Sequence, residues 1–177
     1  VKGMNDILPG AKDAFLDSTV WDFILQQSKM VLEGYGYSEI RLPVVEETQL
    51  FARGLGEDTD IVGKEMYTFE DRGGRSLTLR PEGTASAARS YVENNFSRNN
   101  PVQKWWYFGP MYRAERPQKG RYRQFYQIGA EVFGVSTPAS EAEMLMMLSE
   151  LIQRLGVVEV RLRLNTLGDD ESRAVYR

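Results

Sequence analysis

One short stretch of this sequence concentrates positive charge. Residues 113–123 hold five basic residues and one acid, Glu115, between two apolar and aromatic runs. Guanidinium groups offer planar forks of N–H donors that match phosphate oxygens. Arg113 ends the first run and Arg121 begins the second, so the two side chains converge if the runs pair as strands, and Phe125 could then stack on a base. The stretch predicts a nucleotide site; a solvated basic hairpin tip is the open alternative.

Carboxylates lie on both sides of this stretch. Glu82 precedes it, and Glu131 follows it four residues after Gln127. Alternate residues of a strand share one face, so Phe125, Gln127 and Glu131 would line one pocket wall, with Gly129 leaving space. Paired carboxylates beside arginines could hold a cation and an anion, which fits an amino acid with a basic side chain next to ATP. The alternative for Glu131 is a buried structural ion pair.

The composition restricts the chemistry further. The chain has 177 residues, 42% of them hydrophobic, with a formal net charge of -3 and neither cysteine nor histidine. These counts predict one domain and exclude a disulfide framework, a Ser–His or Cys–His nucleophile pair, and cysteine or imidazole metal ligands. No metal-binding residues are predicted. The sequence has no apolar run long enough to span a membrane and no signal-peptide pattern, so a cytoplasmic protein is expected.

Several elements must position these side chains. Helices are predicted at 11–33, 84–95 and 140–155, and helix with loop at 46–63. Strands are predicted at 38–42, 66–69, 76–79, 102–112, 125–133 and 157–164. Turns or loops join most of the strands, which favours an α+β fold with a mainly antiparallel sheet flanked by helices.

With these motifs in place, the sequence resembles the histidyl-tRNA synthetase family of class II aminoacyl-tRNA synthetases. The resemblance covers essentially the whole chain. It is carried by the opening VKGMNDILPG, the motif 1 region YGYSEIRLPVVEETQLFARGLGEDTDIVGKEMYTFED, the signature LTLRPEGTA, and YFGPMYRAERPQKGRYRQF, which resembles motif 2 and its loop. Motif 1 then spans about 36–63 and motif 2 about 103–134. The fold implied is a class II synthetase-like antiparallel sheet flanked by helices.

The resemblance implies a role for each matching residue of the amino acid site. Glu82, Thr84 and Gln127 would hold the α-ammonium of histidine, and Glu131 would read its imidazole. Arg113 would be the catalytic residue, gripping both the substrate carboxylate and the α-phosphate of ATP.

Further roles concern ATP and tRNA. Arg113 and Glu115 would bind ATP, the latter at the adenine amino edge, with Phe125 stacked on the adenine and Arg121 at the terminal phosphates. The residues implied to approach the tRNA acceptor end are Arg116, Gln118 and Arg123.

The activity implied is ATP-dependent activation of histidine, with Mg²⁺, and its transfer to tRNA(His) by a homodimer joined through motif 1. The family usually has histidine where Ala114 and Tyr126 stand here, so the pocket wall or the tRNA end differs at these positions. Motif 3, the insertion domain and the anticodon-binding domain are not found, so the chain is expected to be a catalytic domain that is incomplete at its C-terminus. Two alternatives stay open: a histidine-binding regulatory subunit of ATP phosphoribosyltransferase, which typically lacks an intact motif 2 loop, and an inactive structural fragment.

Overall fold

The computed structural model describes residues 1–55 and 65–165. The last part of the predicted motif 1 range, 56–63, lies outside these residues. The elements in chain order are η1 (Ala14–Leu16), α1 (Ser18–Gly34), β1 (Ser38–Glu39), β2 (Val45–Glu47), α2 (Thr48–Leu55), β3 (Tyr67–Glu70), β4 (Ser76–Leu79), α4 (Thr84–Glu93), α5 (Phe96–Asn99), β5 (Gln103–Tyr112), β6 (Gln124–Phe133) and α6 (Pro138–Arg154).

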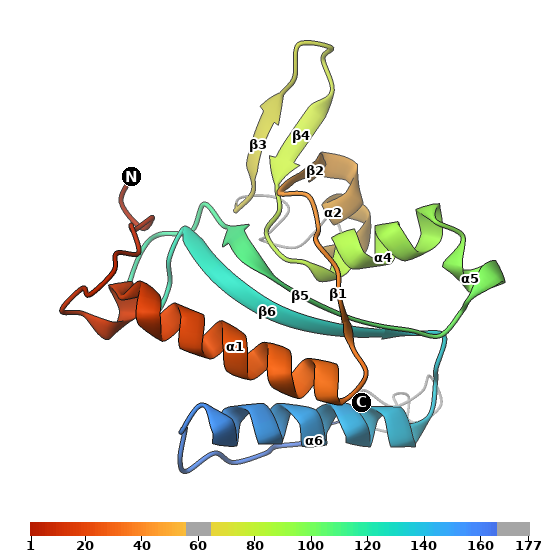
Figure 1. The fold of residues 1–177 in the computed structure, drawn as a ribbon. Helices are drawn as coiled ribbons and strands as arrows, with labels where there is room; N and C mark the ends of the chain where they lie inside the picture. The colour runs from red at the N-terminus through yellow and green to blue at the C-terminus, as the bar shows by residue number, and fades with distance from the viewer. Residues whose placement is uncertain (56–64, 166–177) are drawn as a thin grey trace, which may run out of the picture.

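The larger sheet is built around the two long strands β5 and β6. They pair antiparallel along their whole length, with Tyr107 opposite Gly129 and Gly109 opposite Gln127. The short strand β1 joins the other side of β5 in parallel, which gives the order β1-β5-β6 (Figure 1). The predicted pairing of the two aromatic runs is therefore confirmed.

A smaller sheet of order β2-β4-β3 stands away from the larger one (Figure 1). Its β3–β4 turn is closed by Asp71, whose carboxylate accepts from the backbone N–H groups of Gly73 and Arg75 at 2.8 and 2.9 Å. This hairpin is the one predicted from the Asp-Arg-Gly-Gly sequence.

Helices cover both faces of the larger sheet (Figure 1). α1 and α6 pack on one face, where Val31, Leu32 and Met147 surround Trp106 in a buried cluster. α4 lies on the other face, where a second cluster consists of Ala87, Tyr107 and Met111. Successive residues of β5 thus point to opposite layers, and the expected α+β fold with helices flanking an antiparallel sheet is confirmed.

The ends of the long helices follow their capping residues. α1 begins after Asp17, whose carboxylate accepts from Thr19 N–H, and the first part of the predicted 11–33 helix is instead the separate turn η1. α6 begins after Thr137 with Pro138 in its first turn, as predicted. None of the helices in the described ranges is long and apolar enough to cross a membrane.

Two strand predictions and one helix-and-loop prediction need correction. The strand predicted at 38–42 has only Ser38–Glu39, and β2 forms in a segment predicted as helix and loop. The strand predicted at 157–164 is wrong, because this segment has no strand assignment. It lies beside α6 and lines a cavity of about 750 Å³ with that helix. Alternation of apolar and charged residues does not make a strand without a sheet edge to pair with.

Candidate functional site

The basic loop between β5 and β6 is closed at its base and organised around one carboxylate. Arg113 N–H donates to the carbonyl of Arg123 at 2.9 Å. The Glu115 carboxylate lies 4.0 Å from Nη1 of Arg113 and 3.4 Å from Nη1 of Arg121. The guanidinium of Arg123 donates to the Glu115 carbonyl at 3.0 Å. The arginines therefore converge, as their positions at the strand ends predicted.

Arg113 also connects the loop to the residues before α4. Its Nε donates to the carbonyl of Pro81 at 3.1 Å, and its guanidinium carbon lies 5.1 Å from the centroid of the Phe125 ring. Hydrogen bonding and the cation–π contact together fix the direction of this half-buried side chain. A positive group and an aromatic ring are thus held side by side, an arrangement suited to a nucleotide.

The residues predicted to approach tRNA separate into two environments. Arg116 and Gln118 are exposed on the loop, whereas Arg123 is half-buried. Because the guanidinium of Arg123 bonds the loop backbone, it helps to hold the base of the loop. Only the exposed pair is presented to solvent.

Thr84 and Tyr107 both bond the Glu131 carboxylate. Thr84 Oγ1 donates to Oε1 of Glu131 at 2.7 Å, and the Tyr107 hydroxyl lies 3.2 Å from the same oxygen. Glu131 is therefore held by hydroxyl donors, and within residues 1–55 and 65–165 it forms none of the ion pairs considered from the sequence.

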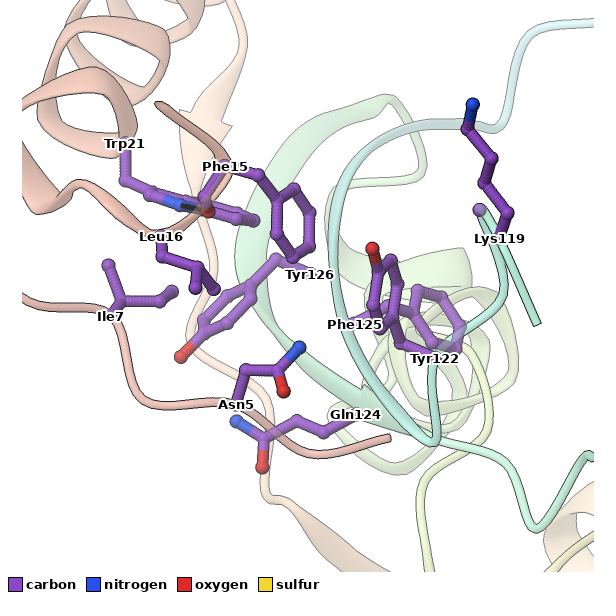
Figure 2. A pocket seen from close by; sticks show the side chains of 11 residues that line it. Asn5, Ile7, Phe15, Leu16, Trp21, Lys119, Tyr122, Gln124, Phe125 and Tyr126 are labelled. Atoms are coloured by element: carbon purple, nitrogen blue, oxygen red, sulfur yellow. Dashed lines mark hydrogen bonds between the residues drawn. The ribbon is translucent and has the colours of Figure 1, made fainter. Parts of the chain in front are cut away.

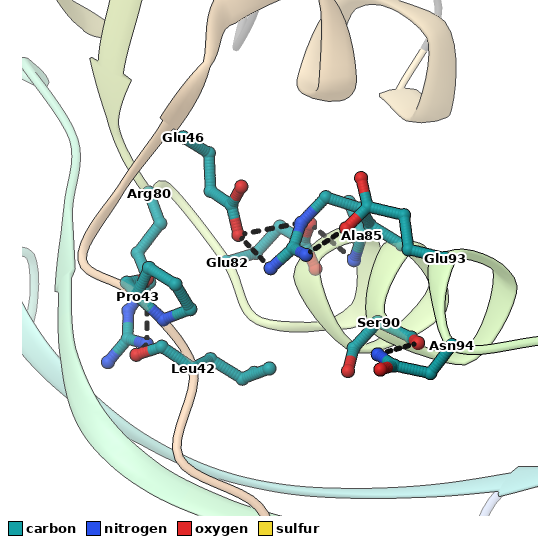
Figure 3. Close-up of polar contacts among 10 residues, drawn as sticks. Leu42, Pro43, Glu46, Arg80, Glu82, Ala85, Ser90, Glu93 and Asn94 are labelled. Atoms are coloured by element: carbon teal, nitrogen blue, oxygen red, sulfur yellow. Dashed lines mark hydrogen bonds and ion pairs between the residues drawn. The ribbon is translucent and has the colours of Figure 1, made fainter.

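Glu82 caps the N-terminus of α4. Its carboxylate accepts from Thr84 N–H at 2.5 Å. It also accepts from Ala85 N–H at 2.9 Å (Figure 3). A carboxylate at a helix N-terminus pairs with otherwise free N–H groups and with the positive end of the helix dipole. This cap fixes the side chain beside Thr84, and the remaining lone pairs of its oxygens can still accept from a ligand.

Gln127 has an unpaired polar atom. Its Oε1 is buried and, among the described residues, has no hydrogen-bond partner. Buried acceptors are nearly always satisfied in folded proteins, so an orphan of this kind calls for a donor from outside the chain. The ammonium group predicted for this position would be such a donor.

Two positioning residues were missed from the sequence. The ring of Tyr107 fits between Gly83 and Gly129, where an added Cβ would lie 2.2 and 2.1 Å from ring atoms. The buried Arg80 is the second, and it donates to the carbonyl of Pro110 at 3.0 Å. It also donates to the carbonyl of Leu42 at 2.8 Å (Figure 3). Burial lowers the pKa of the Arg80 guanidinium. Gly83 and Gly129 were the only sign of this packing in the sequence. The register of the strands was needed to show that the ring between them belongs to Tyr107.

A cavity of about 490 Å³ opens beside the loop and is lined in part by Phe125 (Figure 2). Trp21 and Tyr126 line it, with ring centroids 4.8 Å apart, and Phe15 stacks on Tyr122. Because Tyr126 and Gln127 are neighbours on a strand, they point to opposite faces. Tyr126, one of the positions that departs from the family, therefore lies away from the carboxylates.

The chain is similar to histidyl-tRNA synthetases along most of its length. A family model described as histidyl-tRNA synthetase matches residues 18–168. Histidine–tRNA ligases from Alkalilimnicola ehrlichii and Trichlorobacter lovleyi are 55% and 52% identical to it over all 177 residues. The chain spans only 40% and 41% of the length of these two curated relatives.

Solved structures show the same relationship. A histidyl-tRNA synthetase from S. aureus, solved in the apo form, superposes with a TM-score of 0.80 at 41% identity, covering 98% of this chain and 39% of that one. A Bacillus halodurans protein described as an ATP phosphoribosyltransferase regulatory subunit/histidyl-tRNA synthetase gives a TM-score of 0.70 at 25% identity, covering 90% and 38%.

Proposed function

Since this chain belongs to the histidyl-tRNA synthetase family, we propose that the full-length protein activates histidine with ATP and transfers it to tRNA(His). Residues 1–177 would supply part of its class II catalytic domain, with motif 1 at about 36–63 and motif 2 at about 103–134. Motif 3, the insertion domain and the anticodon-binding domain would then lie elsewhere in the full-length protein.

The observation that carries this proposal is one juxtaposition in the larger sheet. Gln127, whose Oε1 has no partner among the described residues, lies on the same face of β6 as Glu131. Phe125, which contacts Arg113, precedes them on that face. An amino acid would place its ammonium at Gln127, Thr84 and Glu82 and its imidazole at Glu131 (both as the resemblance implies). Its carboxylate would then reach Arg113.

This arrangement suits the activation of an amino acid by ATP, a step that needs no general base. An α-carboxyl group with a pKa of about 3.5 is already ionised at pH 7. One carboxylate oxygen bonds the α-phosphorus of ATP, the bond from that phosphorus to the bridging oxygen breaks, and pyrophosphate leaves. Arg113 would neutralise charge as it builds on the α-phosphate, and alignment supplies most of the remaining catalysis. The ribose hydroxyl of the tRNA then attacks the aminoacyl carbonyl, its proton passes to a phosphate oxygen of the leaving group, and AMP leaves.

The rest of the ATP site would come from the loop. Phe125 would stack on the adenine, Glu115 would accept from its amino group, and Arg121 would reach the terminal phosphates. Within the described residues no group of three or more Asp or Glu side chains could hold a metal ion. Mg²⁺ would shield phosphate charge when bound together with ATP.

Two further parts of the proposal concern partners. Arg116 and Gln118 would meet the tRNA acceptor end, and Arg123 would hold the loop that presents them. Two copies would associate through the motif 1 region to form a homodimer.

A second candidate function is supported by the Bacillus halodurans similarity, whose title includes a regulatory subunit of ATP phosphoribosyltransferase. Such a protein would bind histidine without needing a loop that holds ATP. Here Arg113, Glu115 and Arg121 form one connected cluster, which favours the ligase.

The decisive experiment is ATP–pyrophosphate exchange by the full-length protein with each of the twenty amino acids separately. Exchange with histidine alone is the expected result. Histidine binding without any exchange would instead favour the regulatory candidate. Residues 1–177 tested in parallel should exchange at least ~10²-fold more slowly, because losing one electrostatic contact to a transition state costs roughly 10²–10³ in rate.

A further inference from the structure

We propose that Tyr107 is a positioning residue for histidine selection. Its hydroxyl holds Glu131 so that the carboxylate presents Oε2 to a ring N–H of the bound amino acid. This inference rests on the proposed function, because it takes Glu131 to be the group that reads the imidazole.

The hydrogen bonds to Glu131 have a defined direction. Thr84 and Tyr107 both donate to Oε1 of Glu131, at 2.7 and 3.2 Å. Among the described residues, hydrogen bonds are made to Oε1 of Glu131 and none is made to its Oε2. Because both donors meet Oε1, Oε2 is left as an acceptor, so the group that meets it must carry a hydrogen.

The donor, Tyr107, is held rigidly. Tyr107 is only 2% exposed, and its ring lies against the backbone at Gly83 and Gly129. Burial and the charge of Glu131 raise the pKa of the phenol, so it remains a donor across the physiological range. A ring confined in this way cannot swing its hydroxyl elsewhere, and the carboxylate orientation is set before any ligand arrives.

The role of the Tyr107 hydroxyl can be tested apart from the packing of its ring. Phenylalanine keeps the ring that fills the space between the glycines and removes only the hydroxyl. Tyr107→Phe should therefore leave the fold intact while Glu131 loses one of its donors.

The test is a double-mutant cycle in the full-length protein, with histidine affinity measured by calorimetry. Tyr107→Phe alone should raise the Kd for histidine about tenfold, the effect of a hydrogen bond to a charged group. In the Glu131→Gln background the same change should raise it less than about twofold, because Tyr107 acts through the carboxylate. The Kd for ATP should stay the same in every variant.

A matched control is Tyr91→Phe, which removes a hydroxyl that donates to the Pro101 carbonyl at 2.8 Å, and it should leave the histidine Kd unchanged. Equal effects of Tyr107→Phe in both backgrounds, or no effect in either, would overturn the inference while the proposed function stands. A wild-type protein that does not bind histidine would overturn both.

Discussion

At the scale of single residues, the site depends on two glycines that admit one ring. We predict that Gly129→Ala destabilises the protein by about 1–3 kcal/mol, because the new Cβ would lie 2.1 Å from the Tyr107 ring and force it to move. Urea unfolding measures this. Gly34→Ala is the control and should be neutral or slightly stabilising, because a Cβ added there, in α1, would meet no other side chain or distant backbone atom within 4 Å. An equally stable Gly129→Ala variant would contradict the close contact.

Glu131 should affect the binding of histidine but not the binding of ATP. We predict that Glu131→Gln in the full-length protein weakens histidine binding at least tenfold and changes ATP binding less than twofold, because the altered group faces the amino acid in the proposed site. Calorimetry with each ligand checks this. Equal losses for both ligands would mean that Glu131 supports the sheet and does not read the imidazole.

Strand alternation in the sequence was enough to place Phe125, Gln127 and Glu131 on one wall. It could not identify Tyr107, because that requires the register of β5 against β6, which depends on contacts distant along the chain. The cap formed by Glu82 was also missed, although a carboxylate just before a helix is a recognisable N-terminal signal.

At the scale of elements, α1 has a titratable cap. Thr19 N–H, chiefly, lowers the pKa of Asp17 below its ordinary 3.8. A carboxyl group whose pKa is lower in the folded state adds stability above its unfolded pKa and loses it as pH falls through the folded value. We predict that Asp17→Asn, which keeps a capping oxygen, loses less stability than the wild type between about pH 4 and pH 2. Parallel loss in thermal melts of both proteins would contradict this.

Arg80 ties β4 to two other segments. We predict that Arg80→Lys destabilises the protein by about 1–3 kcal/mol, since one ammonium cannot replace a fork that reaches both Leu42 and Pro110 and leaves a buried carbonyl unpaired. Urea unfolding checks this, with Arg41→Lys as the control because its pair with Glu39 is exposed. A loss no larger than that of the control would show that the carbonyls find other donors.

Element types with local signals were predictable, and elements that depend on distant partners were not. The Asp71 turn and the Thr137 cap act within a few residues, and both elements formed as expected. β2 exists because Val45 pairs with Leu79 of β4, far along the chain. The 157–164 segment has strand periodicity without such a partner.

At the scale of the whole molecule, the β6–α6 side carries exposed apolar residues. β6 pairs only with β5 among the described strands, and Leu148, Val158, Leu162 and Leu164 are 49%, 80%, 62% and 71% exposed. Neighbouring exposed apolar groups favour association, since burying each leucine contributes about 1.5–3 kcal/mol. We predict that residues 1–177 alone self-associate in sedimentation velocity, and that Leu162→Lys with Leu164→Lys weakens this at least tenfold. Val92→Lys, the same kind of change at an exposed residue of α4, should not. Association that survives the double change would point instead to the motif 1 surface, and a monomer at high concentration would contradict both interfaces.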